Sequence, residues 1–267
     1  MMHFYSSRKA QNPSSRYFLV IFFLLIFCNH PLFAARTLFL RDEIQRAEPG
    51  DYLVTAQFNA FTLMLIRDKT DSTLTIEEVT IPEGRFPKGH YSKWRDWFLD
   101  GAPGATSWVT YVIAPKQRQL LTFFSHTTGT YCSADSTNTF LCTLLGLRFF
   151  EIPESQRKRI GGGRSGAPVS IRPVWNPPIV FEGQKTTGVP FTAWRTLWPN
   201  DSTELAGKEV DIYLPEENTR YPAYFPYWLE IKGTFTKAKI RITDTGKGLH
   251  STKPLPKIPQ LSQQRGG

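Results

Sequence analysis

Hydrophobic residues in the first part of the chain alternate with polar ones, which is typical of strands with one covered face. Three strand-like runs follow one another, separated by short polar turns: Asp51–Phe58, Phe61–Ile66 and Ser72–Ile81. The middle run is almost continuously apolar, so we expect both of its faces to be covered. Because the connections are too short for parallel crossovers, the pattern predicts an antiparallel meander. Before it, Arg41–Gly50 predicts one or two helical turns.

The third run changes phase along its length. Leu74 and Ile76 fall out of step with Val79 and Ile81. One extra residue near Glu77–Glu78 would restore the alternation, so the pattern predicts a β-bulge there.

Aromatic residues then recur at helical spacing within His90–Gly104. Tyr91, Trp94 and Phe98 lie three and four residues apart, and a glycine and a proline end the run. This spacing predicts a short amphipathic helix that lies across the sheet.

Strand-like runs resume at Ser107–Pro115 and Arg118–His126. The long apolar run Thr139–Pro153 fits either a buried strand with a kink at Gly146 or a short core helix, because periodicity alone does not separate the two. It leads into a basic, glycine-rich segment without apolar periodicity, which we interpret as a linker.

The C-terminal part begins with tryptophans set among prolines and polar turns, up to about Gly207. We expect an ordered but irregular element there. Three strands of a final sheet follow, at Glu209–Pro215, Tyr227–Gly233 and Phe235–Thr243.

These elements predict a mainly β protein with one or two short helices. It is either an antiparallel meander of barrel-like form or two packed β lobes. The expected divisions are a signal peptide (1–35), an N-terminal β lobe (36–153), a basic linker (154–168), a C-terminal β lobe (169–248) and a disordered tail (249–267).

The first 35 residues have the order of an export signal. A basic start without acidic residues precedes the apolar run Tyr17–Cys28, and small residues follow at Ala34 and Ala35. The run is too short to span a bilayer core of about 30 Å. We therefore expect a protein exported to the periplasm, the cell envelope or the exterior. An uncleaved anchor and a lipoprotein modified at Cys28 are the alternatives.

The net charge of the chain gives little information about its binding partner. Removal of residues 1–35 would leave 29 basic and 23 acidic residues. In an exported protein this excess points to anionic lipid or polysaccharide rather than nucleic acid, and it is also compatible with solubility alone. The expected partners are therefore a lipid or an anionic glycan, with peripheral membrane contact as one form of binding.

Two cysteines remain after export, Cys132 and Cys142. An even pair across a polar turn in an exported chain predicts a disulfide, and two free thiols are the alternative.

The last strands carry the candidate binding face. Alternation places Tyr227, Leu229 and Ile231 on a buried side and Trp228 on a charged side. A ring beside several cations suits an anionic group. The candidate ligand-binding residues are Trp228, Tyr213, Lys232, Lys237, Lys239 and Arg241. The alternative is a solvated face held by cross-strand ion pairs.

Catalytic motifs give no support for an enzyme. The glycine-rich stretch Gly161–Gly166 is followed by prolines, so no helix terminus can receive a phosphate there. The histidines show no metal spacing, and the sequence predicts no catalytic residue, no metal site and no cofactor. A non-catalytic binder of an amphipathic or anionic ligand is the favoured hypothesis. A hydrolase acting on wall or surface polymer and an adhesion component are the alternatives.

Overall fold

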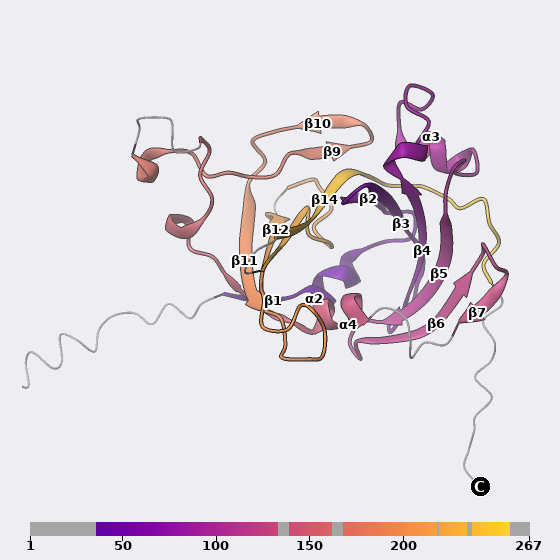
Figure 1. Cartoon of the computed structure of the whole chain (residues 1–267), viewed down its shortest axis with the longest axis horizontal. Helices are drawn as coiled ribbons and strands as arrows, with labels where there is room; N and C mark the ends of the chain where they lie inside the picture. Colours follow the sequence, from indigo (N-terminus) through magenta and orange to yellow (C-terminus); the bar gives the residue numbers. More distant parts are fainter. Residues whose placement is uncertain (1–35, 133–138, 162–167, 218, 234–236, 257–267) are drawn as a thin grey trace, which may run out of the picture. The chain divides into compact units, whose positions relative to one another are not determined.

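One long antiparallel sheet dominates the molecule (Figure 1). The computed structural model describes residues 36–132, 139–161, 168–217, 219–233 and 237–256, so the predicted export signal lies outside the described residues. The strands, in their order across the sheet, are β1 (Thr37–Phe39), β8 (Arg148–Glu151), β11 (Phe191–Leu197), β12 (Glu209–Pro215), β13 (Trp228–Lys232), β14 (Lys237–Gly246), β2 (Tyr52–Gln57), β3 (Ala60–Lys69), β4 (Leu74–Pro82), β5 (Ser107–Ala114), β6 (Gln119–Ser125) and β7 (Thr130–Cys132).

The sheet confirms the predicted mainly β fold and its antiparallel pairing. Its order begins at β1 and ends at β7, so it is not closed into a barrel. The hairpin of β9 (Ile179–Phe181) and β10 (Gln184–Thr186) forms a separate two-stranded sheet.

Strands from the two predicted lobes lie within this one sheet. β14 pairs with β2, and β8 pairs with β11. The described residues belong to one compact unit that begins at Arg36. β11 lies in the stretch predicted to be irregular. It is a strand because β8 and β12 supply hydrogen-bonding partners on its two sides, which a local pattern does not reveal.

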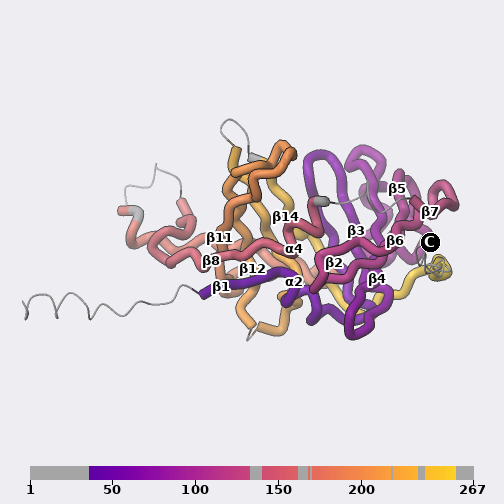
Figure 2. Tube along the Cα trace, turned by 90° about the horizontal axis from the view of Figure 1, so that it is seen from below, coloured from indigo at the N-terminus to yellow at the C-terminus, as the bar shows by residue number. Residues whose placement is uncertain are grey.

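Two helices occupy the inner side of the curved sheet. These are α2 (Leu40–Glu43), continued by the 3₁₀ turn η1 (Ile44–Arg46), and α4 (Thr139–Gly146). Figure 2 shows both between the strands of the N-terminal half and those of the C-terminal half. Leu40, Ile44 and Leu144 pack there in one buried cluster with strand residues such as Ile212. Full burial of each such side chain stabilises the fold by about 1.5–3 kcal/mol.

The run Thr139–Pro153, for which the sequence allowed either a helix or a strand, contains a helix followed by a strand. α4 ends at Gly146, and β8 begins at Arg148. Gly146 leaves room for the side chain of Arg118, whose flexible end a Cβ atom at this position would displace.

The outer side of β2–β5 is covered by α3 (Trp94–Leu99), as the aromatic spacing predicts. Trp97 and Phe98 are fully buried against Val79 and Ile81. The Trp97 indole donates a hydrogen bond to the Pro103 carbonyl oxygen at 3.1 Å. This second cluster is an aromatic-rich core.

The predicted bulge at Glu77–Glu78 is wrong. Leu74 and Ile76 face the inner core, whereas Val79 and Ile81 face α3, because this strand is covered on both sides. The register shift lies instead on the neighbouring strand, between Ile66 and Asp68.

The predicted disordered tail begins with ordered residues. Leu249 is buried under α3, and the Ser251 hydroxyl donates to the buried Glu77 carboxylate at 2.8 Å. Arg67 pairs with the same carboxylate and donates to the Lys253 carbonyl oxygen. A buried charge needs such partners, so the segment 249–256 is held against the sheet. The remainder of the predicted tail lies outside the described residues.

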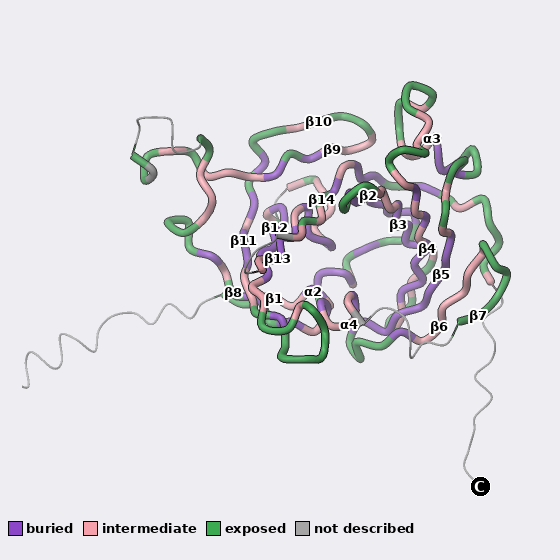
Figure 3. Tube along the Cα trace, in the orientation of Figure 1, coloured by how far each residue is buried: buried purple, intermediate pink, exposed green. Residues whose placement is uncertain are grey.

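Figure 3 shows how the burial of residues is distributed over the fold. Buried residues follow the central strands, while β10 is largely exposed. The remaining 3₁₀ turns are η2 (Glu83–Arg85), η4 (Glu154–Gln156) and η5 (Val169–Ile171). Within the described ranges, none of the helices has the length and apolar character needed to cross a membrane.

Candidate functional site

The candidate binding face is built by three neighbouring strands, β12, β13 and β14. Tyr213 lies opposite Trp228, and Trp228 lies opposite Arg241. In the next row of this face, Asp211, Glu230 and Lys239 are aligned in the same way. Side chains of directly opposed residues share a face of the sheet, so the alternation read from the sequence predicts this grouping correctly.

The part of this face on β12 and β13 is covered, which corrects the sequence-based expectation of a wholly outward charged surface, whereas Lys239 and Arg241 on β14 are exposed. Asp211 is 3% exposed and Glu230 is 1% exposed. Trp175 packs over this part of the face. Its ring centre lies 5.3 Å from that of Tyr213 and 5.1 Å from that of Trp228, and its ring is nearly perpendicular to both.

Trp175 is held in place by the segment predicted to be a linker. The Trp175 amide donates to the Lys158 carbonyl oxygen at 2.7 Å. Arg159 and Val174 form an isolated antiparallel bridge beside it. Residues 157–161 and 172–176 therefore form one hydrogen-bonded cover over β12 and β13, while residues 162–167 lie outside the described residues.

Every buried carboxylate under this cover has a cationic partner. Arg195 donates two hydrogen bonds to Asp211, at 2.7 and 2.9 Å. Lys232 lies 2.7 Å from Asp211 and 2.5 Å from Glu209. The Lys158 ammonium pairs with Glu230. Of the predicted cross-strand ion pairs, those of Lys232 with Glu209 and Asp211 are present, whereas Glu230 pairs with Lys158 of the cover.

These contacts shift the ionisation of the groups. Burial alone would raise the pKa of Asp211, but hydrogen bonds from Arg195 and Lys232 and their charges hold that pKa below its ordinary value. Burial raises the pKa of Tyr213 to about 12, and the nearby carboxylates Asp211 and Glu230 act in the same direction. Asp211 is therefore ionised and Tyr213 is neutral at physiological pH.

Two lysines contact the ring of Trp228. The Lys158 nitrogen lies 5.5 Å from its centre and 5.3 Å from the centre of Trp175. The Lys239 nitrogen lies 5.6 Å from the Trp228 centre. These distances are within the range of cation–π attraction. Lys158 also has Glu230 as a partner, whereas Lys239 and Arg241 are exposed and form no salt bridge with the described residues.

Comparison with known proteins identifies a similar fold. A family model described as CT021 protein matches residues 62–187. The hypothetical protein CT021 from Chlamydia trachomatis has a solved structure with a TM-score of 0.61 and 19% sequence identity, and the match covers 84% of this chain and 100% of that chain. No curated protein matches.

At this identity the likeness concerns the fold alone, and neither description names a function. The family match includes Lys158 and Trp175 and ends before Tyr213 and Trp228.

The structure separates the six predicted binding residues into three groups. Tyr213 is buried beneath Trp175, and Lys232 is engaged by Glu209 and Asp211. Trp228, Lys239 and Arg241 are partly or fully reachable from solvent. The backbone of Lys237 pairs with Lys232, and its side chain lies outside the described part.

Sequence reasoning missed the role of Lys158 and placed Trp175 in an irregular element. Neither residue belongs to a periodic run, because both reach the sheet through the cover. The local sequence offered one signal: a tryptophan and a lysine lie in segments that have no apolar periodicity and so predict no core of their own.

The predicted disulfide is not formed, since Cys132 and Cys142 are both free. Cys132 is exposed on β7 at one end of the sheet, whereas Cys142 lies on α4 inside the curve (Figure 1). The helix carries Cys142 into the inner core, and burial raises the pKa of its thiol.

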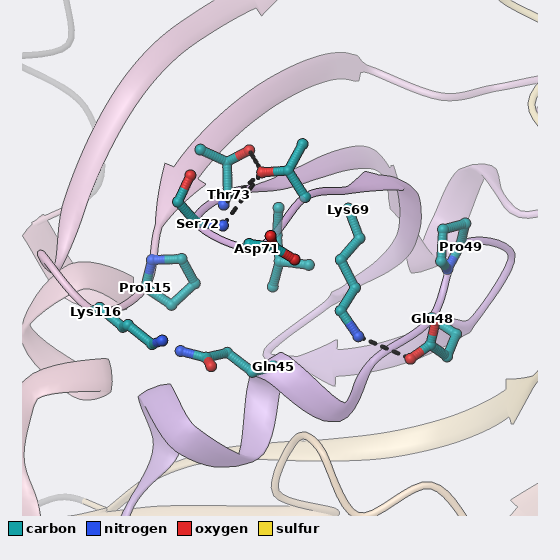
Figure 4. Close-up of a pocket in the computed structure, with 11 residues that line it drawn as sticks. Gln45, Glu48, Pro49, Lys69, Asp71, Ser72, Thr73, Pro115 and Lys116 are labelled. Atoms are coloured by element: carbon teal, nitrogen blue, oxygen red, sulfur yellow. Dashed lines mark hydrogen bonds and ion pairs between the residues drawn. The ribbon is translucent and has the colours of Figure 1, made fainter.

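A separate pocket of about 530 Å³ lies beside the turn that connects β3 and β4. Figure 4 shows Lys69 turned toward Glu48, with its nitrogen 2.7 Å from the carboxylate, and Lys116 turned toward Gln45. Its lining is mostly polar and mixes both charges. This pocket lacks the rings that distinguish the surface around Trp228.

The three histidines outside residues 1–35 have different surroundings. His90 and His250 are exposed, and the ring of His126 forms a hydrogen bond of 2.8 Å with Thr110. Burial lowers the pKa of His126. Among the residues that the structure describes, no group of three or more His, Cys, Asp or Glu side chains could hold a metal ion.

Proposed function

We infer that this chain is an exported, non-catalytic binding protein that holds an anionic, amphipathic ligand at the outer surface of β13 and β14. The observation that supports this function is the position of Lys239 and Arg241. Both are exposed, both lie beside Trp228, and neither forms a salt bridge with the described residues.

The three residues supply complementary interactions. The guanidinium of Arg241 suits two parallel hydrogen bonds to a phosphate or carboxylate, and Lys239 adds a point charge. The ring of Trp228 offers an apolar face for the rest of the ligand. A lipid head group and an acidic polysaccharide both carry this chemistry.

Export is the second part of the proposal. Its support is the order of basic, apolar and small residues within residues 1–35. The protein would then reside in the periplasm, the cell envelope or the exterior, where anionic lipids and glycans are available, and peripheral contact with a membrane would be one mode of binding.

Binding is tested with two sources of the anionic group. Phosphatidylglycerol vesicles and polygalacturonate are titrated against the wild type and the variant Lys239→Ala/Arg241→Ala. We expect about tenfold or greater loss of affinity for the true source, since one charge-assisted hydrogen bond contributes about 1.5–3 kcal/mol.

The matched control is Lys116→Ala/Lys185→Ala, which removes the same charge from exposed positions elsewhere. An equal loss in this control would reduce the effect to net charge and contradict a specific surface. Cell fractionation tests export: the account expects a polypeptide that begins near Arg36 outside the cytosol, and an intact cytosolic chain would contradict it.

A further inference from the structure

Trp175 and Trp228 form the two aromatic walls of a cation site, called the cage below, and the buried Tyr213 packs edge-on against Trp175. Trp175 stands nearly perpendicular to each of the other two rings, with interplanar angles of 82° and 74°. Glu230 lies at the base, where its carboxylate accepts a hydrogen bond of 3.4 Å from the Trp228 indole. The faces of the two tryptophan rings and the Glu230 carboxylate all attract a cation at this site.

A cation already occupies this cage in the structure. The Lys158 ammonium lies within 5.5 Å of the centres of both tryptophan rings and pairs with Glu230. Its side chain is 39% exposed, so the mouth of the cage opens to solvent. Lys158 comes from the cover and not from the strands that build the walls.

We propose that the cage is a binding site for an alkylammonium group and that Lys158 is the chain's own stand-in for that group. Release of the flexible lysine stem frees both the ring faces and the space that its methylene groups fill. A trialkylammonium group suits this site because it gains its binding from ring faces and the carboxylate rather than from directed hydrogen bonds.

This inference rests on the proposed function and names its ligand class. Trp228 is shared by the cage and by the surface that carries Lys239 and Arg241. A zwitterion with a phosphate beside a trialkylammonium group, as in phosphocholine, would place its anion on Arg241 and Lys239 and its cation in the cage. The same chemistry occurs in a lipid head group and in a glycan decorated with phosphocholine.

The cage is tested by calorimetric titration with choline and with 3,3-dimethylbutanol, which has the same shape without the charge. In the variant Lys158→Ala the stand-in is absent. If Lys158 fills the cage in about nine-tenths of wild-type molecules, its removal makes choline binding about tenfold tighter. The neutral alcohol is expected not to bind.

Two further variants keep the result interpretable. Lys185→Ala removes an exposed lysine from β10 and should leave choline binding at the wild-type level. Lys158→Ala/Trp175→Leu removes one wall and should abolish the gain. If Lys158→Ala does not fold, Lys158→Ser, which removes both the ammonium and the stem and keeps a polar side chain, is expected to bind choline more tightly than the wild type.

Failure of the cage and failure of the proposed function are distinguishable. Absence of choline binding in folded Lys158 variants, or equal binding of the neutral alcohol, overturns the cage while anion binding through Lys239 and Arg241 stands. Loss of anion binding selectivity with intact choline binding overturns the proposed function alone. Phosphocholine on vesicles and phosphocholine free in solution then separate the lipid source from a soluble one.

Discussion

Two regions on the outer side of the same sheet are covered by tryptophans in different ways. The row Trp228, Arg241, Ala56, Phe61 and Ile81 crosses from one region to the other through direct strand pairing. At one end α3 seals a core of rings and aliphatic side chains. At the other end Trp175 covers carboxylates and their cations.

We infer from this difference that the region under α3 contributes mainly to stability and the region under Trp175 mainly to binding. Apolar burial under α3 contributes directly to the free energy of folding. Buried ion pairs contribute little net stability, because desolvation offsets much of their attraction. A cover that encloses charges and leaves Lys239 and Arg241 exposed is therefore the better candidate for ligand binding than for structural support.

The largest effect is expected from Trp97→Ala under α3. Trp97 is fully buried, and loss of its ring should lower the free energy of unfolding by about 3–5 kcal/mol, measured by urea denaturation. Leu99→Ala, at an exposed position of the same helix, is the control and should change it little. Equal effects of the two substitutions would contradict a packed core beneath α3.

The next effect is expected from Asp211→Asn under the Trp175 cover, and it depends on pH. The folded-state pKa of Asp211 is lowered, so its contribution to stability is present above the ordinary value near 3.9 and disappears as pH falls through the lowered value. At neutral pH the variant should be less stable by about 1–3 kcal/mol, because the charge-assisted contacts with the two cations Arg195 and Lys232 are lost.

Asp244 is the control, because its folded-state pKa is shifted in the opposite direction and stability therefore depends on pH with the opposite sign. Burial raises its folded-state pKa, so wild-type stability increases as pH falls through that raised value toward the ordinary one. Asp244→Asn should therefore show its most favourable stability relative to wild type at neutral pH. Parallel pH profiles for the two variants would contradict the assigned environments.

A smaller effect is expected from Trp175→Ala. The ring is partly exposed and makes two edge-on aromatic contacts, so its loss should lower the free energy of unfolding by about 1–2 kcal/mol. Denaturation monitored by circular dichroism measures this change. A loss as large as that of Trp97→Ala would show that the cover is a structural core.

The smallest effect on stability is expected from Lys239→Ala. The side chain is exposed and forms no salt bridge with the described residues, so the change should stay within about 0.5 kcal/mol. Its thermal unfolding midpoint should match the wild type while its affinity for the anionic ligand falls. A clear loss of stability would assign Lys239 to packing.

Local patterns predicted the strands and the amphipathic helix because each signal lies within a few residues. The alternation in Tyr227–Gly233 placed Trp228 and Glu230 on the same face correctly. It did not reveal that this face is enclosed, since the cover comes from residues 157–161 and 172–176. The phase change in Ser72–Ile81 likewise resembled a bulge, although the strand is buried against two different cores. Contacts between distant segments decide such cases.

The most direct test follows the indole N–H signals of the tryptophans by NMR while phosphocholine is added to the Lys158→Ala variant. The account predicts that the signals of Trp175 and Trp228 shift together and saturate, whereas those of Trp97 and Trp108 under the α3 side stay in place. Unchanged Trp175 and Trp228 signals, or a shift confined to the tryptophans near α3, would contradict it.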